Sequence, residues 1–204
     1  MNTPTFTWRN VKHYGQRLTI PKKEIIYHQG EEGKGFYFLE EGEVKISIIR
    51  DDGYERIIDY VTPEQLIGEQ GISNDSYVTT AETITDSVLY YFTKNKFHQL
   101  CKEVPEAAEA FSISFITKIR LLVDAQSLLD APVDVQLAHY LLLLCQKHNS
   151  FWIEINKTAM SRYLGKSRVT IWKILKQWEK KDIIRLQDHF VHLKDVAALR
   201  DFLM

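Results

Sequence analysis

The chain has few cysteines, no long apolar run and no metal-type spacing of ligand residues. Only two of its 204 residues are cysteines, Cys101 and Cys145, and they lie far apart in the sequence. The most apolar stretch, Leu137–Cys145, has nine residues and is too short to span a bilayer. The first ten residues contain no apolar run typical of a secretory signal. We therefore expect a cytoplasmic protein with reduced thiols, no metal and no membrane contact.

Positive charge is scarce in the first part of the chain and abundant in the last. The net charge of −1 says nothing about nucleic acid, but residues 131–204 hold 12 Lys and Arg against 7 Asp and Glu. Residues 1–130 hold the remaining 14 and 20. Between Asn156 and Lys181 there are eight basic side chains and one acidic side chain, Glu179. A surface of this kind attracts a phosphate backbone, although a basic helix alone could also be an ordinary solvated amphipathic helix.

The order of caps and turns in this basic segment predicts a helix-turn-helix. Asn156 is a suitable N-cap for a first helix, Lys157–Leu164, Gly165 supplies the turn, and Ser167 can cap a second helix. The second helix has one apolar face and one mostly basic side, which suits the major groove of DNA. The residues on its apolar face are Ile171, Ile174, Leu175 and Trp178, and those off that face are Arg168, Val169, Trp172, Lys173 and Lys176.

Residues about 18–95 are typical of a β domain. Short segments rich in Ile, Val, Tyr and Phe alternate with glycine turns, which predicts a small antiparallel, jelly-roll-like β-roll. The expected strands are Gly35–Leu39, Glu43–Ile49, Glu55–Val61 and Ser87–Thr93.

After the strands the hydrophobic period becomes helical. A long helix is expected from Pro105 to about Leu129, with a seam of alternating four- and three-residue steps that could pair with a second copy. The seam residues are Phe115, Ile119, Leu122, Gln126 and Leu129. The alternative is that this stripe packs only on its own roll. Pro132 ends the helix, and a helix, a short strand, the helix-turn-helix and a hairpin wing follow. The predicted α+β organisation is a sensing roll over 1–104, a dimerisation helix over 105–130 and a winged helix-turn-helix over 131–204.

This order of elements resembles the catabolite-activator/fumarate–nitrate-regulator (Crp/Fnr) superfamily of bacterial transcription factors. The resemblance covers about residues 18–202. In the roll it rests on the glycine series, on LIGE at Leu66–Glu69 and on TITDSVLYYF at Thr83–Phe92. In the last part, LGKSRVTIWKILKQWEKKDII at Leu164–Ile184 is similar to the recognition-helix pattern of the superfamily.

The resemblance implies a homodimer joined through the long helix and a small effector bound between roll and helix. Two recognition helices about one DNA turn apart would read a near-palindromic operator in double-stranded DNA. An effector acts only if it binds the DNA-competent state more tightly than the other state. RNA polymerase is a further partner that the resemblance allows.

The roll departs from the members that bind cyclic nucleotides. Those members hold the phosphate with an Arg and a following hydroxylated residue, and these positions fall here on Tyr77 and Val78. No Arg or Lys lies between Arg56 and Lys94. We therefore expect no standard cyclic-nucleotide mode. The predicted pocket suits an uncharged or aromatic effector, or it is filled by side chains with no effector; its residues are Gly68, Glu69, Tyr77, Val78, Leu121 and Leu122.

Other chemistries fit the sequence less well. Oxygen-sensing relatives hold an iron–sulfur cluster with four thiolates, which two cysteines cannot supply. An enzyme on a cupin-like roll would need a histidine–carboxylate cluster, yet His28 is the only histidine between Gln16 and Phe97. A sensor dimer whose winged helix contacts protein remains the alternative to a DNA-binding regulator.

Matching the superfamily pattern assigns roles on the basic segment. Base-reading positions fall on Arg168, Val169, Trp172 and Lys173. Where the superfamily often has Glu, Val169 would favour a thymine methyl. Trp172 could pack on thymine methyls or on the sugar edge of DNA. Alternatively, it packs against a neighbouring DNA-binding domain or against the roll. Candidates for phosphate contact, which positions without specifying, are Lys157, Lys166, Ser167, Thr170 and Lys176.

Overall fold

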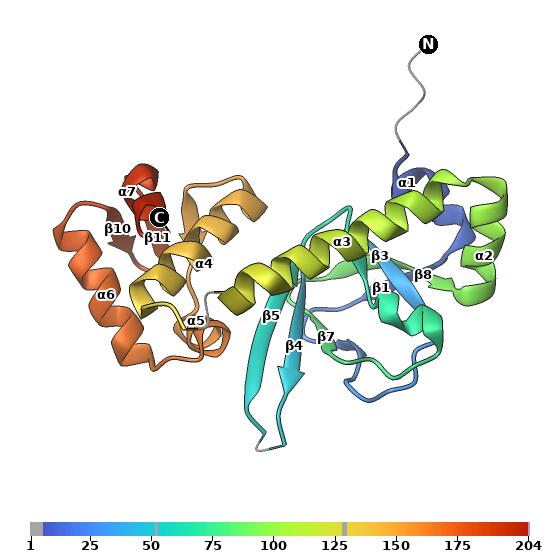
Figure 1. The fold of residues 1–204 in the computed structure, drawn as a ribbon, viewed down its shortest axis with the longest axis horizontal. Helices are drawn as coiled ribbons and strands as arrows, with labels where there is room; N and C mark the ends of the chain where they lie inside the picture. The colour runs from blue at the N-terminus through green and yellow to red at the C-terminus, as the bar shows by residue number, and fades with distance from the viewer. Residues whose placement is uncertain (1–5, 52, 128–129, 204) are drawn as a thin grey trace, which may run out of the picture. The chain divides into compact units, whose positions relative to one another are not determined.

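The computed structural model describes residues 6–51, 53–127 and 130–203. The chain forms two compact units, residues 1–121 and 122–204, so the division falls within one long helix. Figure 1 shows the elements of both units. Antiparallel sheets, a long helix and a winged helix-turn-helix follow one another along the chain, which confirms the predicted fold class.

The first unit is a roll of two four-stranded antiparallel sheets. One sheet has the strand order β1-β8-β3-β6 and the other β2-β7-β4-β5. The strands Glu55–Val61 and Ser87–Thr93 have their predicted bounds, while the strand at Gly35 extends to Glu41. The bounds are β1 Gln16–Ile20, β2 Ile25–Tyr27, β3 Gly35–Glu41, β4 Val44–Ile49, β5 Glu55–Val61, β6 Leu66–Ile67, β7 Thr80–Thr83 and β8 Ser87–Thr93.

Short helices frame the roll. They are α1 Trp8–Val11, the 3-10 turns η1 Lys12–Tyr14 and η2 Glu69–Ser73, and α2 Lys94–Glu103. The long helix α3 spans Glu106–Ser127 and begins directly after Pro105. Aromatic rings from α1, the strands, α2 and α3 share one core, which attaches the start of α3 to the roll by apolar burial. These rings are Trp8, Phe36, Phe92, Phe97 and Phe111.

The position of Phe115 differs from that expected for a residue of the dimer seam. Its ring lies 5.3 Å from that of Phe111 and packs against the roll core, so it faces the roll of its own chain. Among the described side chains of α3, the large apolar ones that are exposed are Ile113, Ile116, Ile119, Leu122 and Val123. Ile116, Ile119 and Val123 follow three- and four-residue steps. The exposed stripe therefore includes Ile116 in place of the predicted Phe115. Gln126 is exposed, and Leu129 lies outside the described residues.

The second unit is a winged helix-turn-helix. Its helices are α4 Val133–His148, α5 Lys157–Leu164, α6 Arg168–Lys180 and α7 Val196–Asp201. A three-stranded antiparallel sheet of order β10-β11-β9 combines Ile184–Gln187, Phe190–Leu193 and Trp152–Glu154. The helices and the sheet enclose a small apolar core, whose largest fully buried side chains are Leu137, Leu141, Ile153 and Met160.

Candidate functional site

Local hydrogen bonds explain why α5 and α6 form two helices joined by a tight turn. The Asn156 side chain accepts bonds from the N–H groups of Thr158 and Ala159, at 2.9 and 3.1 Å. Gly165 has a φ of +64°, a left-handed conformation that glycine adopts without steric cost. Ser167 then accepts a bond from the Thr170 N–H at 3.1 Å. Both predicted caps and the predicted turn are confirmed.

Helix α6 has one buried face and one exposed face. Ile171, Leu175 and Trp178 are buried in the second unit, and Ile174 is half-buried. The exposed side carries Arg168, Val169, Thr170, Lys173 and Lys176, and Val169 is 66% exposed. Apolar burial fixes the helix, and the free side presents two apolar methyl groups among cations. Such a surface can offer both hydrogen-bond donors and methyl contacts to base edges.

Trp172 does not lie bare on this surface. Its half-buried ring is 4.1 Å from the Nζ of Lys157 and 5.2 Å from the Nζ of Lys176, both measured to the ring centroid. Lys157 is the first residue of α5, and Lys176 lies one turn further along α6. The structure thus brings one predicted base-reading residue, Trp172, and two predicted phosphate-contacting residues, Lys157 and Lys176, together within the winged helix-turn-helix unit.

Two hydroxyls assigned to phosphate contact already take part in capping. Ser167 Oγ lies 2.8 Å from Thr170 Oγ1 and caps the start of α6. Lys166, the remaining candidate in this turn, is half-buried, and its carbonyl accepts a 2.6 Å bond from Ser161 Oγ. The turn between α5 and α6 is therefore held by hydrogen bonds from its own side chains.

Glu179 connects α6 to the wing, a role that charge counting alone did not reveal. One carboxylate oxygen accepts the Leu186 N–H at 3.0 Å, and the other lies 2.9 Å from the Nζ of Lys176. These two bonds, led by that of Lys176, lower the pKa of Glu179 below its ordinary value. The single acidic side chain of the basic segment therefore orients both a lysine and the first strand of the wing.

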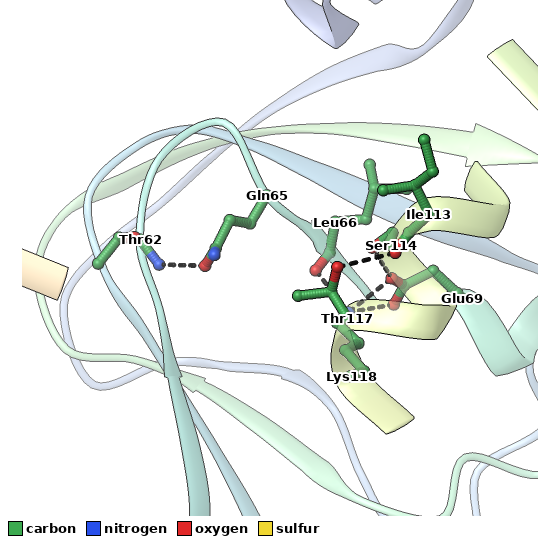
Figure 2. A network of polar contacts seen from close by, with 8 residues as sticks. All are labelled: Thr62, Gln65, Leu66, Glu69, Ile113, Ser114, Thr117 and Lys118. Atoms are coloured by element: carbon green, nitrogen blue, oxygen red, sulfur yellow. Dashed lines mark hydrogen bonds and ion pairs between the residues drawn. The ribbon is translucent and has the colours of Figure 1, made fainter. Parts of the chain in front are cut away.

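In the roll, the carboxylate of Glu69 is bound by helix α3. Glu69 is 1% exposed and follows Gly68, whose φ of +72° begins the η2 turn. The carboxylate accepts bonds from Ser114 Oγ at 2.7 Å and from Lys118 Nζ at 2.6 Å. Lys118 also donates to the carbonyl of Leu66 at 2.8 Å, as Figure 2 shows. A buried carboxylate requires such partners, because its desolvation is otherwise very unfavourable.

Lys118 is not among the predicted pocket residues, because the cation was expected within the strands and not on the long helix. The lysine comes from α3, 49 residues after Glu69 in the sequence. Its signal was nevertheless present: Ser114 and Lys118 are four residues apart and therefore share one side of a helix. Phe111 and Phe115 mark that side as the one facing the roll.

The other predicted pocket residues differ widely in burial. Tyr77 is buried, its ring stacks 3.9 Å from that of Tyr27, and its hydroxyl donates to the Gly35 carbonyl at 3.0 Å. Burial raises the pKa of the Tyr77 phenol. Val78 is 65% exposed and Leu122 is 52% exposed, while Leu121 is half-buried. Tyr77 thus belongs to the roll core, Val78 and Leu122 are exposed in the single chain, and their assignment to an effector pocket stays a prediction.

Two further classes of feature concern membranes and metals. No helix within residues 6–51, 53–127 and 130–203 combines the length and the apolar character needed to cross a membrane. Within the same ranges, no three His, Cys, Asp or Glu side chains gather as metal ligands.

Comparison with known proteins covers both units of the chain. Residues 17–104 match the cyclic nucleotide-binding domain, and residues 135–202 match the Crp-like helix-turn-helix domain. The cAMP-activated global transcriptional regulator CRP of Escherichia coli O157:H7 is 25% identical over 173 residues, covering 80% of this chain and 82% of that protein. The transcriptional activator protein Anr of Pseudomonas protegens is 20% identical over 190 residues, covering 88% and 77%.

Solved structures share the fold. The structure of FixK2 from Bradyrhizobium japonicum superposes with a TM-score of 0.81 at 18% identity, covering 92% of this chain and 96% of that one. Both domain matches occur in the order that the roll and the winged helix-turn-helix require. The chain belongs to the Crp/Fnr family of transcriptional regulators.

Proposed function

We propose that the chain forms a homodimer that binds a near-palindromic operator in double-stranded DNA and regulates transcription. The observation that carries this proposal is the exposed side of α6, where Arg168, Val169 and Lys173 are held outward by the buried face of the same helix. Two such helices in a symmetric dimer would enter successive major grooves about 34 Å apart.

Each exposed side chain has a role that its chemistry allows. Arg168 and Lys173 donate to guanine O6 and N7, and Val169 contacts a thymine methyl. Lys157, Lys166 and Lys176 contact phosphates, with Ser167 and Thr170 at the same turn. Since Val169 cannot accept a bond from cytosine N4, the operator differs from those of relatives that carry Glu at this position.

The dimer forms through the exposed stripe of α3. Ile116, Ile119 and Val123 present apolar side chains along the helix, flanked by Ile113 and Leu122. An exposed row at three- and four-residue steps is the pattern that pairs two helices. The resemblance to the Crp/Fnr superfamily implies a homodimer joined through the long helix, which agrees with this use of the stripe.

The regulator does not use a cyclic nucleotide in the standard way. The phosphate-binding Arg of cyclic-nucleotide-binding members has no counterpart near Tyr77 and Val78. The carboxylate of Glu69 is already bound by Ser114 and Lys118 of the same chain. This contact favours a pocket filled by the chain's own side chains over one awaiting a small uncharged effector. DNA binding without added ligand is therefore expected.

Selection of bound duplexes from random sequence, with no added ligand and with heparin as competitor, tests the function. A near-palindrome with half-sites one helical turn apart is the expected result. A protein that enriches no duplex, even with candidate effectors present, and binds a protein partner independently of salt would instead be a sensor or interaction module.

A further inference from the structure

The ring of Trp172 contacts the ammonium groups of two lysines, which come from two helices. Lys157 at the start of α5 places its Nζ 4.1 Å from the ring centroid, and Lys176 of α6 places its Nζ at 5.2 Å. Both distances lie within the range where an ammonium group is attracted to the face of an indole. The two lysines are exposed, so their charges stay accessible from solvent.

A cation–π contact holds a lysine without neutralising it. The ammonium keeps its charge and its donors for an oxygen on the side away from the ring. A free lysine loses rotamer freedom when it is fixed against a phosphate, and a lysine that already rests on a ring loses less. Glu179, 2.9 Å from Lys176, restrains the same side chain from the wing side.

We propose that Trp172 is a positioning residue that holds Lys157 and Lys176 as a paired phosphate contact, and that it does not read a base. This inference rests on the proposed DNA-binding function and deepens it. Lys157 Nζ lies over the face of the ring, and that part of its surface is no longer free to pack against a thymine methyl. The indole, which is half-buried, instead connects the start of α5 to the middle of α6.

The salt dependence of operator affinity separates these two roles. The logarithm of affinity falls with the logarithm of salt concentration by about 0.9 for each phosphate contact. Trp172→Ala is expected to weaken operator binding by roughly 3- to 30-fold and to make the salt slope shallower. Its losses should be nearly equal on the operator and on duplexes altered at single base pairs. Trp172→Phe, which keeps a ring, should lie between Ala and the wild type.

A double-mutant comparison assigns the effect to the lysines. In a Lys157→Gln/Lys176→Gln background, Trp172→Ala should have almost no further effect, because its two partners are already gone. Lys166→Gln is the matched control: it removes a charge from the same head, and its effect should simply add to that of Trp172→Ala. Circular dichroism and thermal melting of each variant show whether the head remains folded.

Different results would contradict the positioning role of Trp172 and the proposed DNA-binding function. If Trp172→Ala or Trp172→Phe changes the preferred bases at one symmetric position while the slope stays constant, Trp172 reads DNA and the inference is wrong. Full additivity with the lysine double variant would also refute it. If the wild-type chain prefers no duplex at all, the proposed function itself fails.

Discussion

At the scale of single residues, Arg168 is an exposed side chain that is proposed to contact the bases of the operator. It is the first residue of α6, is exposed, and stands directly after the cap formed by Ser167. We expect Arg168→Ala to weaken operator binding by about 1–3 kcal/mol for each lost base contact. Titration of a labelled operator measures the loss, and equal affinities of mutant and wild type would exclude this role.

Val169 supplies a complementary change of specificity. Val169→Glu replaces methyl groups with a carboxylate that accepts a bond from cytosine N4, so the preferred base should change at one symmetric position of the operator. Selection from a random duplex library detects the change. An unaltered profile would mean that another residue occupies this base-reading position.

Glu69 represents the opposite case, a charged residue whose partners are all internal. Replacing Lys118 with Met leaves the carboxylate buried beside Ser114 alone, which should lower the free energy of unfolding by about 1–3 kcal/mol. Urea denaturation of the roll measures this loss. A Glu69→Leu/Lys118→Met variant is the control, because replacing both members of a buried pair is often nearly neutral. Undiminished stability of the single variant would show that the pair contributes little.

At the scale of elements, α6 and the wing are coupled through Glu179. We expect Glu179→Ala to destabilise the second unit by about 0.5–1.5 kcal/mol, because the Leu186 N–H loses its acceptor. Glu179→Gln keeps an oxygen for Leu186 and should lose less. Thermal melting of both variants compares the hydrogen bond with the ion pair, and identical losses would assign the whole effect to the charge.

The same carboxylate predicts a pH dependence of folding. Because the pKa of Glu179 is lowered in the folded protein, its contribution to stability is present above the ordinary carboxyl pKa. That contribution is lost as the pH falls through the lowered value. Melting temperatures of wild type and Glu179→Gln should therefore converge toward acidic pH. A constant difference between them would contradict the assignment.

The elements themselves could be predicted because their signals are local. The caps Asn156 and Ser167, the turn at Gly165 and the alternating strands each depend on neighbouring residues. The side of α3 that meets the roll could not be chosen in this way. The helix carries apolar residues on several sides, so the hydrophobic pattern alone does not decide whether Phe115 or Ile116 faces the roll. The contacts of Lys118 and Trp172 join residues distant in sequence, which periodicity does not detect.

At the scale of the whole molecule, the proposed function depends on pairing two winged helix-turn-helix units in a homodimer. A dimer binds two half-sites in one event, so its affinity for a full operator greatly exceeds that of one head for a half-site. The α3 stripe contains Ile119, which is exposed in the single chain. Its burial in a dimer would remove apolar surface from water, which stabilises the pair.

We therefore expect Ile119→Glu to separate the dimer, because two carboxylates would face each other across an apolar seam. Analytical ultracentrifugation should show a monomer, and affinity for a full operator should fall toward that for an isolated half-site. Lys102→Gln, an exposed position on α2, changes the net charge by the same amount and should leave the dimer intact. Half-site binding by Ile119→Glu should match that of wild type, since the recognition surface is untouched. A variant that stays dimeric would mean that the two copies meet through another surface, and that the exposed stripe of α3 serves a different partner.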